Sequence, residues 1–193
     1  MAKLGSFCAA LVAASLAAAV EAAPITVVMS LSGAAEFPSN ASPGVGTAVI
    51  TLDDDADLFR VQATFSGLTG NTTMAHIHCC LVPPAPTVSV ATELPSFTGF
   101  PLDVTSGTYD HTFDTTQDST FNPAFLAAHV TAEGAADALF AGILAGRAYL
   151  NIHTTAFPAG EIRGFASPVP EPGSLALVGV AALVGLSLRR RRR

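Results

Sequence analysis

Short apolar runs beside basic residues occupy both ends of this 193-residue chain, and they restrict the folded part to the segment between them. The first run spans residues 4–19 and follows Lys3, and the second spans residues 174–188 and precedes five arginines. The segment between them, residues 24–168, has the length of about one domain. A chain of that length can bury most of a core without disulfides. The sequence therefore predicts one central domain with a separate segment at each end.

The first 23 residues have the three parts of a signal peptide. Lys3 supplies the positive region, residues 4–19 supply the apolar region, and Val20-Glu21-Ala22 places small residues at the positions that signal peptidase recognises. Cleavage after Ala22 or Ala23 would start the mature chain near Pro24. The alternative is an uncleaved N-terminal anchor.

The last 25 residues also read as a processing segment. Pro170, Glu171 and Pro172 precede the second apolar run, and five arginines end the chain. This order resembles the PEP-CTERM sorting signal of Gram-negative bacteria, which implies cleavage by an exosortase-type membrane protease. The apolar run is short for a spanning helix, but arginine snorkelling and bilayer thinning can accommodate it.

The basic end of that helix would stay in the cytoplasm. We therefore expect an exported protein that the transmembrane sorting helix, within residues 169–193, anchors transiently in the inner membrane. Its destination would be the cell envelope or the extracellular space. A plain C-terminal tail anchor is the alternative.

The central segment is strongly acidic. Residues 24–168 contain three arginines, no lysine and thirteen acidic residues, a formal charge of −10. Such a surface lacks the cationic patch that nucleic-acid binding requires, so no nucleic-acid partner is expected. The acidic run at residues 53–57 lacks the glycine and the distal glutamate of an EF-hand loop, and it predicts a solvated hairpin turn.

Alternating apolar and polar residues dominate the central segment and are typical of half-buried strands. Strands are predicted at residues 25–31, 47–52, 59–65, 74–80, 107–113, 148–153 and 160–165. Residues 81–105 read as a long loop. Asn122 and Pro123 begin a helical insert, which Gly134 is expected to divide into helices 124–132 and 135–145. The predicted fold is mainly β, an antiparallel β-sandwich or barrel with a small helical insert.

Histidines at alternate positions form the main candidate site. Side chains alternate along a strand, so four of them share one face of strand 74–80: Met74, His76, His78 and Cys80. His153 in a later strand is a possible third ligand. Imidazoles that point in one direction are suited to copper or zinc. His111 and His129 lie outside this pattern.

The last predicted hairpin supplies polar neighbours for these histidines. It sets Asn151 and His153 beside Glu161 and Arg163. Glu161 could accept a hydrogen bond from a ligand imidazole, whereas Arg163 would repel a cation. The alternative is a metal-free polar network that ties the hairpin to strand 74–80, formed by His76, His78, Asn151, Glu161 and Arg163.

Cys79 and Cys80 are adjacent in the sequence. A disulfide between neighbours is strained, so the pair does not indicate an ordinary disulfide framework. Three interpretations stay open: a buried pair of small apolar side chains, a reactive thiol pair, or a soft metal ligand.

Six short motifs in the central segment resemble the CHRD domain, first described in chordin, in their order. They are LSGAAEFP (residues 31–38), GTA (46–48), SGLT (66–69), AHIH (75–78), YLNIHT (149–154) and GEIRG (160–164). The resemblance covers residues 25–165 and implies a β-rich extracellular domain with no established enzymatic activity, suspected of mediating interactions. The chain departs from the pattern at Cys79-Cys80, where a Gly-Pro pair is common, and in a longer segment at residues 82–120.

Three functions follow as hypotheses. The first is an exported, non-enzymatic interaction protein of the cell surface or a biofilm matrix, whose partners are extracellular polysaccharide or surface proteins. It rests on the two end segments, the acidic surface and the lack of a positioned nucleophile–base pair. The second is an extracytoplasmic copper or zinc protein that uses His76, His78 and His153. The third is a thiol redox function for Cys79 and Cys80.

Overall fold

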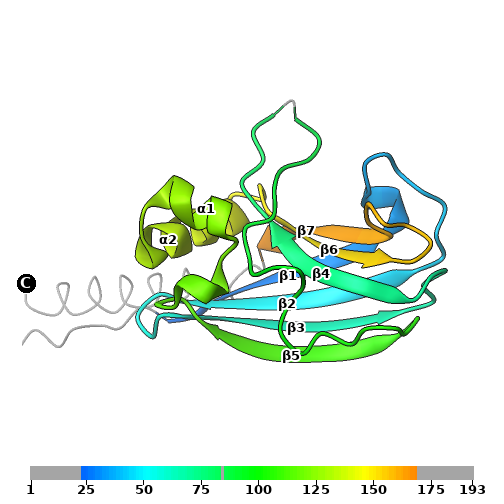
Figure 1. Ribbon diagram of the computed structural model, residues 1–193, viewed down its shortest axis with the longest axis horizontal. Coiled ribbons are helices and arrows are strands. Elements are labelled where there is room, and N and C mark those ends of the chain that lie inside the picture. The colour runs from blue at the N-terminus through cyan, green and yellow to red at the C-terminus, as the bar shows by residue number, and fades with distance from the viewer. Residues whose placement is uncertain (1–22, 84, 169–193) are drawn as a thin grey trace, which may run out of the picture.

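The structure is a computed structural model that describes residues 23–83 and 85–168 (Figure 1). The predicted signal peptide, apart from Ala23, and the predicted sorting segment with its Pro170-Glu171-Pro172 motif lie outside the described residues. Within the described ranges, no helix is both long and apolar enough to cross a membrane.

Seven antiparallel strands form one sheet in the order β4-β6-β7-β1-β2-β3-β5. The strands are β1 (Ile25–Ser32), β2 (Val45–Asp53), β3 (Leu58–Ser66), β4 (Thr72–His78), β5 (Gly107–Asp114), β6 (Tyr149–Thr154) and β7 (Ile162–Pro168). The acidic run at residues 53–57 turns β2 back into β3, as predicted, with Asp53 paired to Leu58.

The sheet curls into half of a barrel (Figure 1). The predicted mainly β, antiparallel architecture is therefore confirmed at a coarse level. In the described part of the chain all seven strands belong to one curled sheet. Its edge strands, β4 and β5, do not pair with each other.

Two helices, α1 (Pro123–His129) and α2 (Ala132–Leu144), form the helical insert. Asn122 caps α1 as predicted, since its side chain accepts a hydrogen bond from the Ala124 N–H. The predicted break at Gly134 is wrong. The chain turns at Val130, whose φ is 74°, and the Thr131 hydroxyl caps α2 by accepting a hydrogen bond from the Gly134 N–H at 3.0 Å.

Gly134 lies inside the first turn of α2, where the two helices approach closely. A Cβ at this position would lie 2.5 Å from the His129 carbonyl oxygen. We expect Gly134→Ala to lower the free energy of unfolding by about 1–3 kcal/mol, although alanine alone favours a helix by about 1 kcal/mol over glycine. Urea denaturation measures the change. A stabilised variant would contradict the close approach.

The core lies between the inner face of the sheet, the helices and the loop at residues 91–106. Phe59 of β3 stacks on Phe113 of β5, with 4.5 Å between the ring centroids. Leu139 and Ile143 of α2 are completely buried against the same cluster, and Phe97 joins it from the loop. This packing places α2 beside the end of β4.

Strand β6 is buried along its whole length, unlike β2 and β3, whose outer faces are exposed at alternate residues. An antiparallel sheet commonly leaves one face exposed to solvent. Burial of both faces of β6 therefore means that other segments of the chain pack on its outer face. Three segments distant in sequence lie over this part of the sheet: residues 33–36, residues 85–90 and residues 155–160. They enclose a polar cluster on the face opposite the core.

Candidate metal centre

Three histidines meet on the covered outer face of the sheet. Antiparallel pairing of β4 with β6 sets His76 opposite Asn151 and His78 opposite Tyr149, and His153 lies opposite Met74. One ring nitrogen from each histidine belongs to a group whose members all lie within 4.8 Å of one another. The structure therefore brings together the three histidines that the alternation of side chains singled out.

Main-chain carbonyls determine the tautomer of two of these rings. His78 Nδ1 lies 2.7 Å from the Val88 carbonyl oxygen, and His153 Nδ1 lies 2.9 Å from that of Pro158. A carbonyl oxygen can only accept a hydrogen bond, so each Nδ1 carries the proton and donates it. The Nε2 atom of each ring then presents a lone pair, as in most histidines that bind metals.

Three further ring nitrogens of the cluster are buried and have no hydrogen-bond partner. They are His78 Nε2, His153 Nε2 and His76 Nδ1. Buried polar atoms in folded proteins almost always have a partner, so three unpartnered nitrogens in one cluster make it the candidate site for a ligand.

Burial keeps these imidazoles neutral. It lowers the pKa of His76 to about 3, with smaller contributions from His153 and His78. Burial also lowers the pKa of His78 to about 4, against the raising effect of its bond to Val88, and lowers the pKa of His153. Neutral imidazole is the form that binds a metal.

Arg163 ties two of the covering segments to the sheet. Its Nε donates to the Ala35 carbonyl at 2.5 Å, and its Nη1 donates to the Pro86 carbonyl at 3.2 Å. The guanidinium lies over the ring of Tyr149, 4.8 Å from its centroid. Because β6 lies between β4 and β7, Tyr149 stands between Arg163 and His78, and the His78 ring stacks on it at 4.7 Å.

Glu36 opposes the charge of Arg163. Its Oε2 lies 3.7 Å from Arg163 Nε, while its Oε1 is buried without a partner. Burial raises the pKa of Glu36 to about 7, although Arg163 and the Phe37 N–H lower it. Glu36 could not be predicted as a site residue, because a lone glutamate in a turn has no periodicity that predicts its contacts.

Glu161 does not contact a histidine, which corrects the expectation that it holds a ligand imidazole or belongs to the histidine network. Its carboxylate accepts hydrogen bonds from four donors: Ser42 Oγ, Thr154 Oγ1, Thr69 N and Gly70 N. The alternation of side chains along a strand does not predict the position of Glu161, because β7 begins only at Ile162. Of the expected polar neighbours, Asn151 and Arg163 do pair across β6 and β7.

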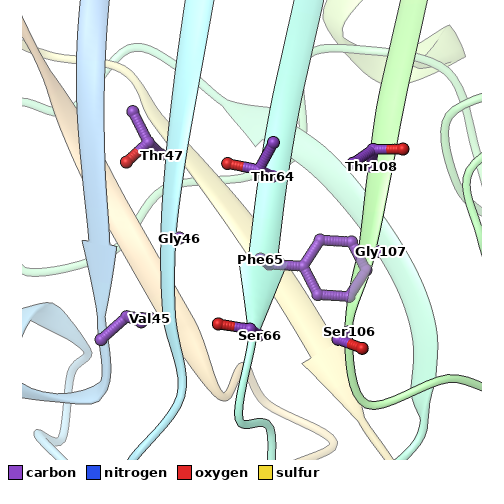
Figure 2. A pocket seen from close by; sticks show the side chains of 9 residues that line it. All are labelled: Val45, Gly46, Thr47, Thr64, Phe65, Ser66, Ser106, Gly107 and Thr108. Atoms are coloured by element: carbon purple, nitrogen blue, oxygen red, sulfur yellow. The ribbon is translucent and has the colours of Figure 1, made fainter.

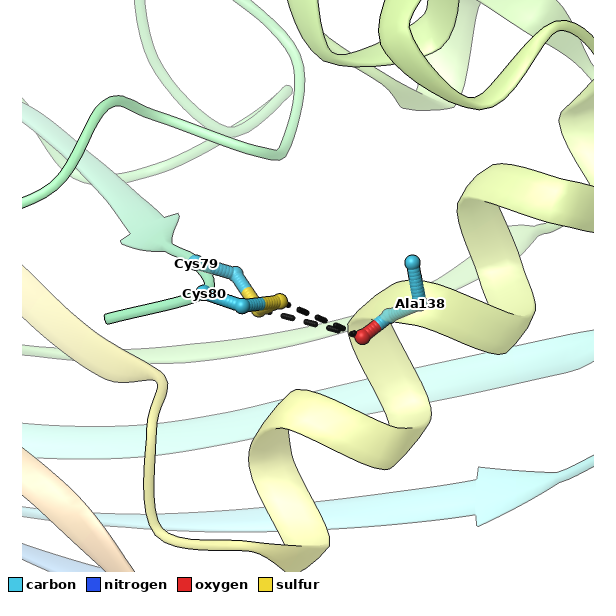
Figure 3. Close-up of a disulfide and its surroundings, with 3 residues drawn as sticks. All are labelled: Cys79, Cys80 and Ala138. Carbon is cyan, nitrogen blue, oxygen red and sulfur yellow. Dashed lines mark hydrogen bonds between the residues drawn. A yellow bond between two sulfur atoms is a disulfide. The ribbon is translucent and has the colours of Figure 1, made fainter. Parts of the chain in front are cut away.

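Cys79 and Cys80 follow the end of β4 and form a disulfide with each other. The prediction that Cys80 shares the histidine face is therefore wrong, and the sulfurs are not free thiols. The strand ends here because the chain bends toward residues 88–90, where Cys79 N–H donates to the Ser89 carbonyl. The disulfide contacts α2 at the Ala138 carbonyl (Figure 3).

A separate groove lies on the outer face of β2, β3 and β5 (Figure 2). Thr47, Thr64 and Thr108 face one another in register across these three strands. The other lining residues are Val45, Gly46, Phe65, Ser66, Ser106 and Gly107. The hydroxyl groups that line the groove offer hydrogen bonds to a bound molecule.

Comparison with known protein families confirms both resemblances found in the sequence. Residues 168–192 match the PEP-CTERM protein-sorting motif, which indicates an exported, cell-envelope-associated protein processed by exosortase-type machinery. No curated protein and no solved structure gives a match. Residues 27–166, which include the three histidines and most of the sheet, match the CHRD domain. The chain therefore belongs to the CHRD domain family.

Proposed function

We propose that this exported domain binds a copper or zinc ion through His76, His78 and His153, and that it is a binding protein without enzymatic activity. The observation that carries the proposal is the set of three buried, unpartnered ring nitrogens. Two of these rings are oriented by Nδ1–H bonds to carbonyls, the arrangement that typically supports metal-bound histidines.

The histidine nitrogens need to move only moderately closer together to bind one metal ion. Nitrogen ligands lie about 2.0–2.1 Å from zinc, so tetrahedral neighbours are roughly 3.4 Å apart. One ring nitrogen of each histidine already lies within 4.8 Å of those of the other two. Small side-chain rotations therefore complete the set, and water or a second molecule supplies any further ligand. Imidazole is compatible with either metal.

Arg163 does not rule out a bound cation in this arrangement. The ring of Tyr149 separates its guanidinium from His78, and the buried carboxyl group of Glu36 stands beside it. Two carbonyls also accept hydrogen bonds from the guanidinium. These neighbours reduce the repulsion that the sequence analysis expected.

The untagged mature domain is expected to hold about one zinc or copper ion per chain after loading and dialysis. The double variant His76→Ala/His78→Ala removes two of the three ligands and is expected to lose the metal, as measured by elemental analysis. The matched control is His111→Ala/His129→Ala, which removes two histidines outside the cluster and is expected to retain it.

A second candidate function is the interaction protein of the first hypothesis, with polysaccharide or surface proteins as partners. The acidic surface and the hydroxyl-lined groove on β2, β3 and β5 favour it. A metal-free wild-type domain whose histidine variant only loses stability would favour this function over metal binding. Transient anchoring in the inner membrane and a place in a biofilm matrix are part of the same proposal.

A further inference from the structure

The disulfide lies at a junction of three parts of the fold. Cys79 directly follows His78, one of the proposed metal ligands. Cys80 precedes Leu81, whose N–H donates to the carbonyl of Arg147, in the connection between α2 and β6, 2.8 Å away. Val88 follows in the sequence, and its carbonyl accepts a hydrogen bond from the His78 Nδ1–H. The disulfide thus stands between the sheet, α2 and the segment that orients His78.

The backbone of α2 packs closely against the two sulfurs (Figure 3). Cys80 Sγ lies 3.2 Å and Cys79 Sγ 3.9 Å from the Ala138 carbonyl oxygen, as packing contacts, because a disulfide sulfur has no proton. A Cβ on Gly142 would overlap both sulfurs. The disulfide therefore occupies a place that the helix leaves free only because residue 142 is glycine.

When the sulfur–sulfur bond is broken, the two sulfurs must move apart where they pack against α2. Two thiol sulfurs need van der Waals separation, and the helix backbone at Ala138 and Gly142 blocks movement in its direction. Cys79 is 3% exposed, whereas Cys80 is half-buried and is the residue with room to turn away. Its movement changes the backbone of residues 79–81, where the Cys79 N–H donates to the Ser89 carbonyl.

We infer that the Cys79–Cys80 disulfide is a redox switch of the histidine site, so that reduction weakens metal binding. This inference rests on the proposed metal-binding function. The physiological reductant is a dithiol. One of its thiolates attacks Cys80 Sγ, the more accessible sulfur, and releases the Cys79 thiolate, which takes up a proton. The second thiolate of the dithiol then displaces Cys80, so two cysteine thiols form and the reductant becomes a disulfide.

The effect reaches the metal through one hydrogen bond. A shift of the hydrogen bond from the Cys79 N–H to the Ser89 carbonyl moves the neighbouring Val88. The bond between His78 Nδ1 and the Val88 carbonyl then weakens, and the Nε2 lone pair loses its fixed direction. Loss of such a supporting contact typically reduces metal affinity 10–100-fold. We therefore expect reduction to weaken zinc binding at least tenfold.

Zinc affinity is measured by competition with a chromophoric chelator, in the oxidised mature domain and in the same domain reduced with a phosphine and desalted under argon. Thiol titration verifies the change from zero to two thiols. Cys79→Ser/Cys80→Ser keeps two unbonded side-chain atoms against α2, so it is expected to bind zinc as weakly as the reduced protein and to be insensitive to the phosphine. Gly142→Ala keeps both cysteines but fills the space that their sulfurs occupy against α2. It is therefore expected to weaken zinc binding in the oxidised protein.

The outcomes separate the two proposals. Tight binding by the oxidised protein with a tenfold or larger loss on reduction supports the switch. Equal affinity in both states, or tighter binding after reduction through the new thiols, overturns the switch and leaves the metal site intact. An oxidised protein that binds no zinc overturns the metal site and the switch with it. Circular dichroism of each variant verifies that it is folded.

Discussion

Replacement of Glu161 by glutamine is expected to lower the free energy of unfolding by about 4 kcal/mol. The carboxylate is completely buried and accepts four hydrogen bonds, from two hydroxyl groups and from the N–H groups of Thr69 and Gly70. Glutamine has one oxygen acceptor and one NH₂ donor, so two of these donors would face another donor. Each hydrogen bond to a charged group contributes about 1.5–3 kcal/mol.

The same carboxylate makes stability depend on pH. Burial raises the pKa of Glu161, but the hydrogen bonds from Ser42, Thr154, Thr69 and Gly70 outweigh it and hold the pKa below its ordinary value of 4.5. The stabilisation is therefore present above about pH 4.5 and is lost as the pH falls through the folded-state pKa. Glu161→Gln is expected to flatten this acid limb of the stability profile.

Urea denaturation between pH 3 and 7 measures both effects, and Glu133→Gln is the matched control. Glu133 is an exposed glutamate in the first turn of α2, so its replacement is expected to change stability little. A Glu161→Gln protein as stable as the wild type at pH 7 would contradict the assigned role. That role is to fix residues 42 and 69–70 to the last hairpin.

The sequence predicted the strands well where one face is buried and the other is solvated. In β2 and β3 the burial alternates with the side chains, so the period of two is visible in the residue types. The same alternation placed His76 and His78 on one face of β4. The predicted alternation continued beyond the ends of the strands and wrongly placed Cys80 and Glu161 beside the histidines. In the structure β4 stops at His78 and β7 begins after Glu161.

The cover over the histidines could not be predicted from residue types. Main-chain carbonyls of Val88, Pro158 and Ala35 hold His78, His153 and Arg163 in place. Any residue presents a carbonyl, so these contacts have no side-chain signature. Helix boundaries show a related limit, since the close approach of Gly134 to the His129 carbonyl depends on tertiary packing and not on helix propensity.

Replacement of Arg163 by methionine is expected to lower the free energy of unfolding by about 3 kcal/mol at pH 8 and by clearly less at pH 5. At both pH values the variant loses the hydrogen bonds to the Ala35 and Pro86 carbonyls. At pH 8 it also leaves the buried carboxylate of Glu36 without its cation. Removal of one partner of a buried ion pair is strongly destabilising because the other charge stays buried.

Glu36 accounts for the dependence on pH. Burial already raises the pKa of its carboxyl group to about 7 against the lowering effect of Arg163, so removal of Arg163 raises it further. A carboxyl group whose folded-state pKa exceeds its unfolded value stabilises the fold when protonated, and that stabilisation is lost as the pH rises through the folded-state pKa. In Arg163→Met the loss of stability between pH 5 and 8 is therefore larger than in the wild type.

A double-mutant cycle with Glu36→Gln isolates this coupling. Urea denaturation of the wild type, both single variants and the double variant at pH 5 and 8 cancels the contribution of the histidines, which all four proteins share. The expected coupling is larger at pH 8, because only an ionised Glu36 interacts strongly with Arg163. The exposed pair of Arg60 with Asp110 is the control, since Arg60→Met is expected to change stability little at either pH. Equal coupling at both pH values would mean that Glu36 does not titrate in this range.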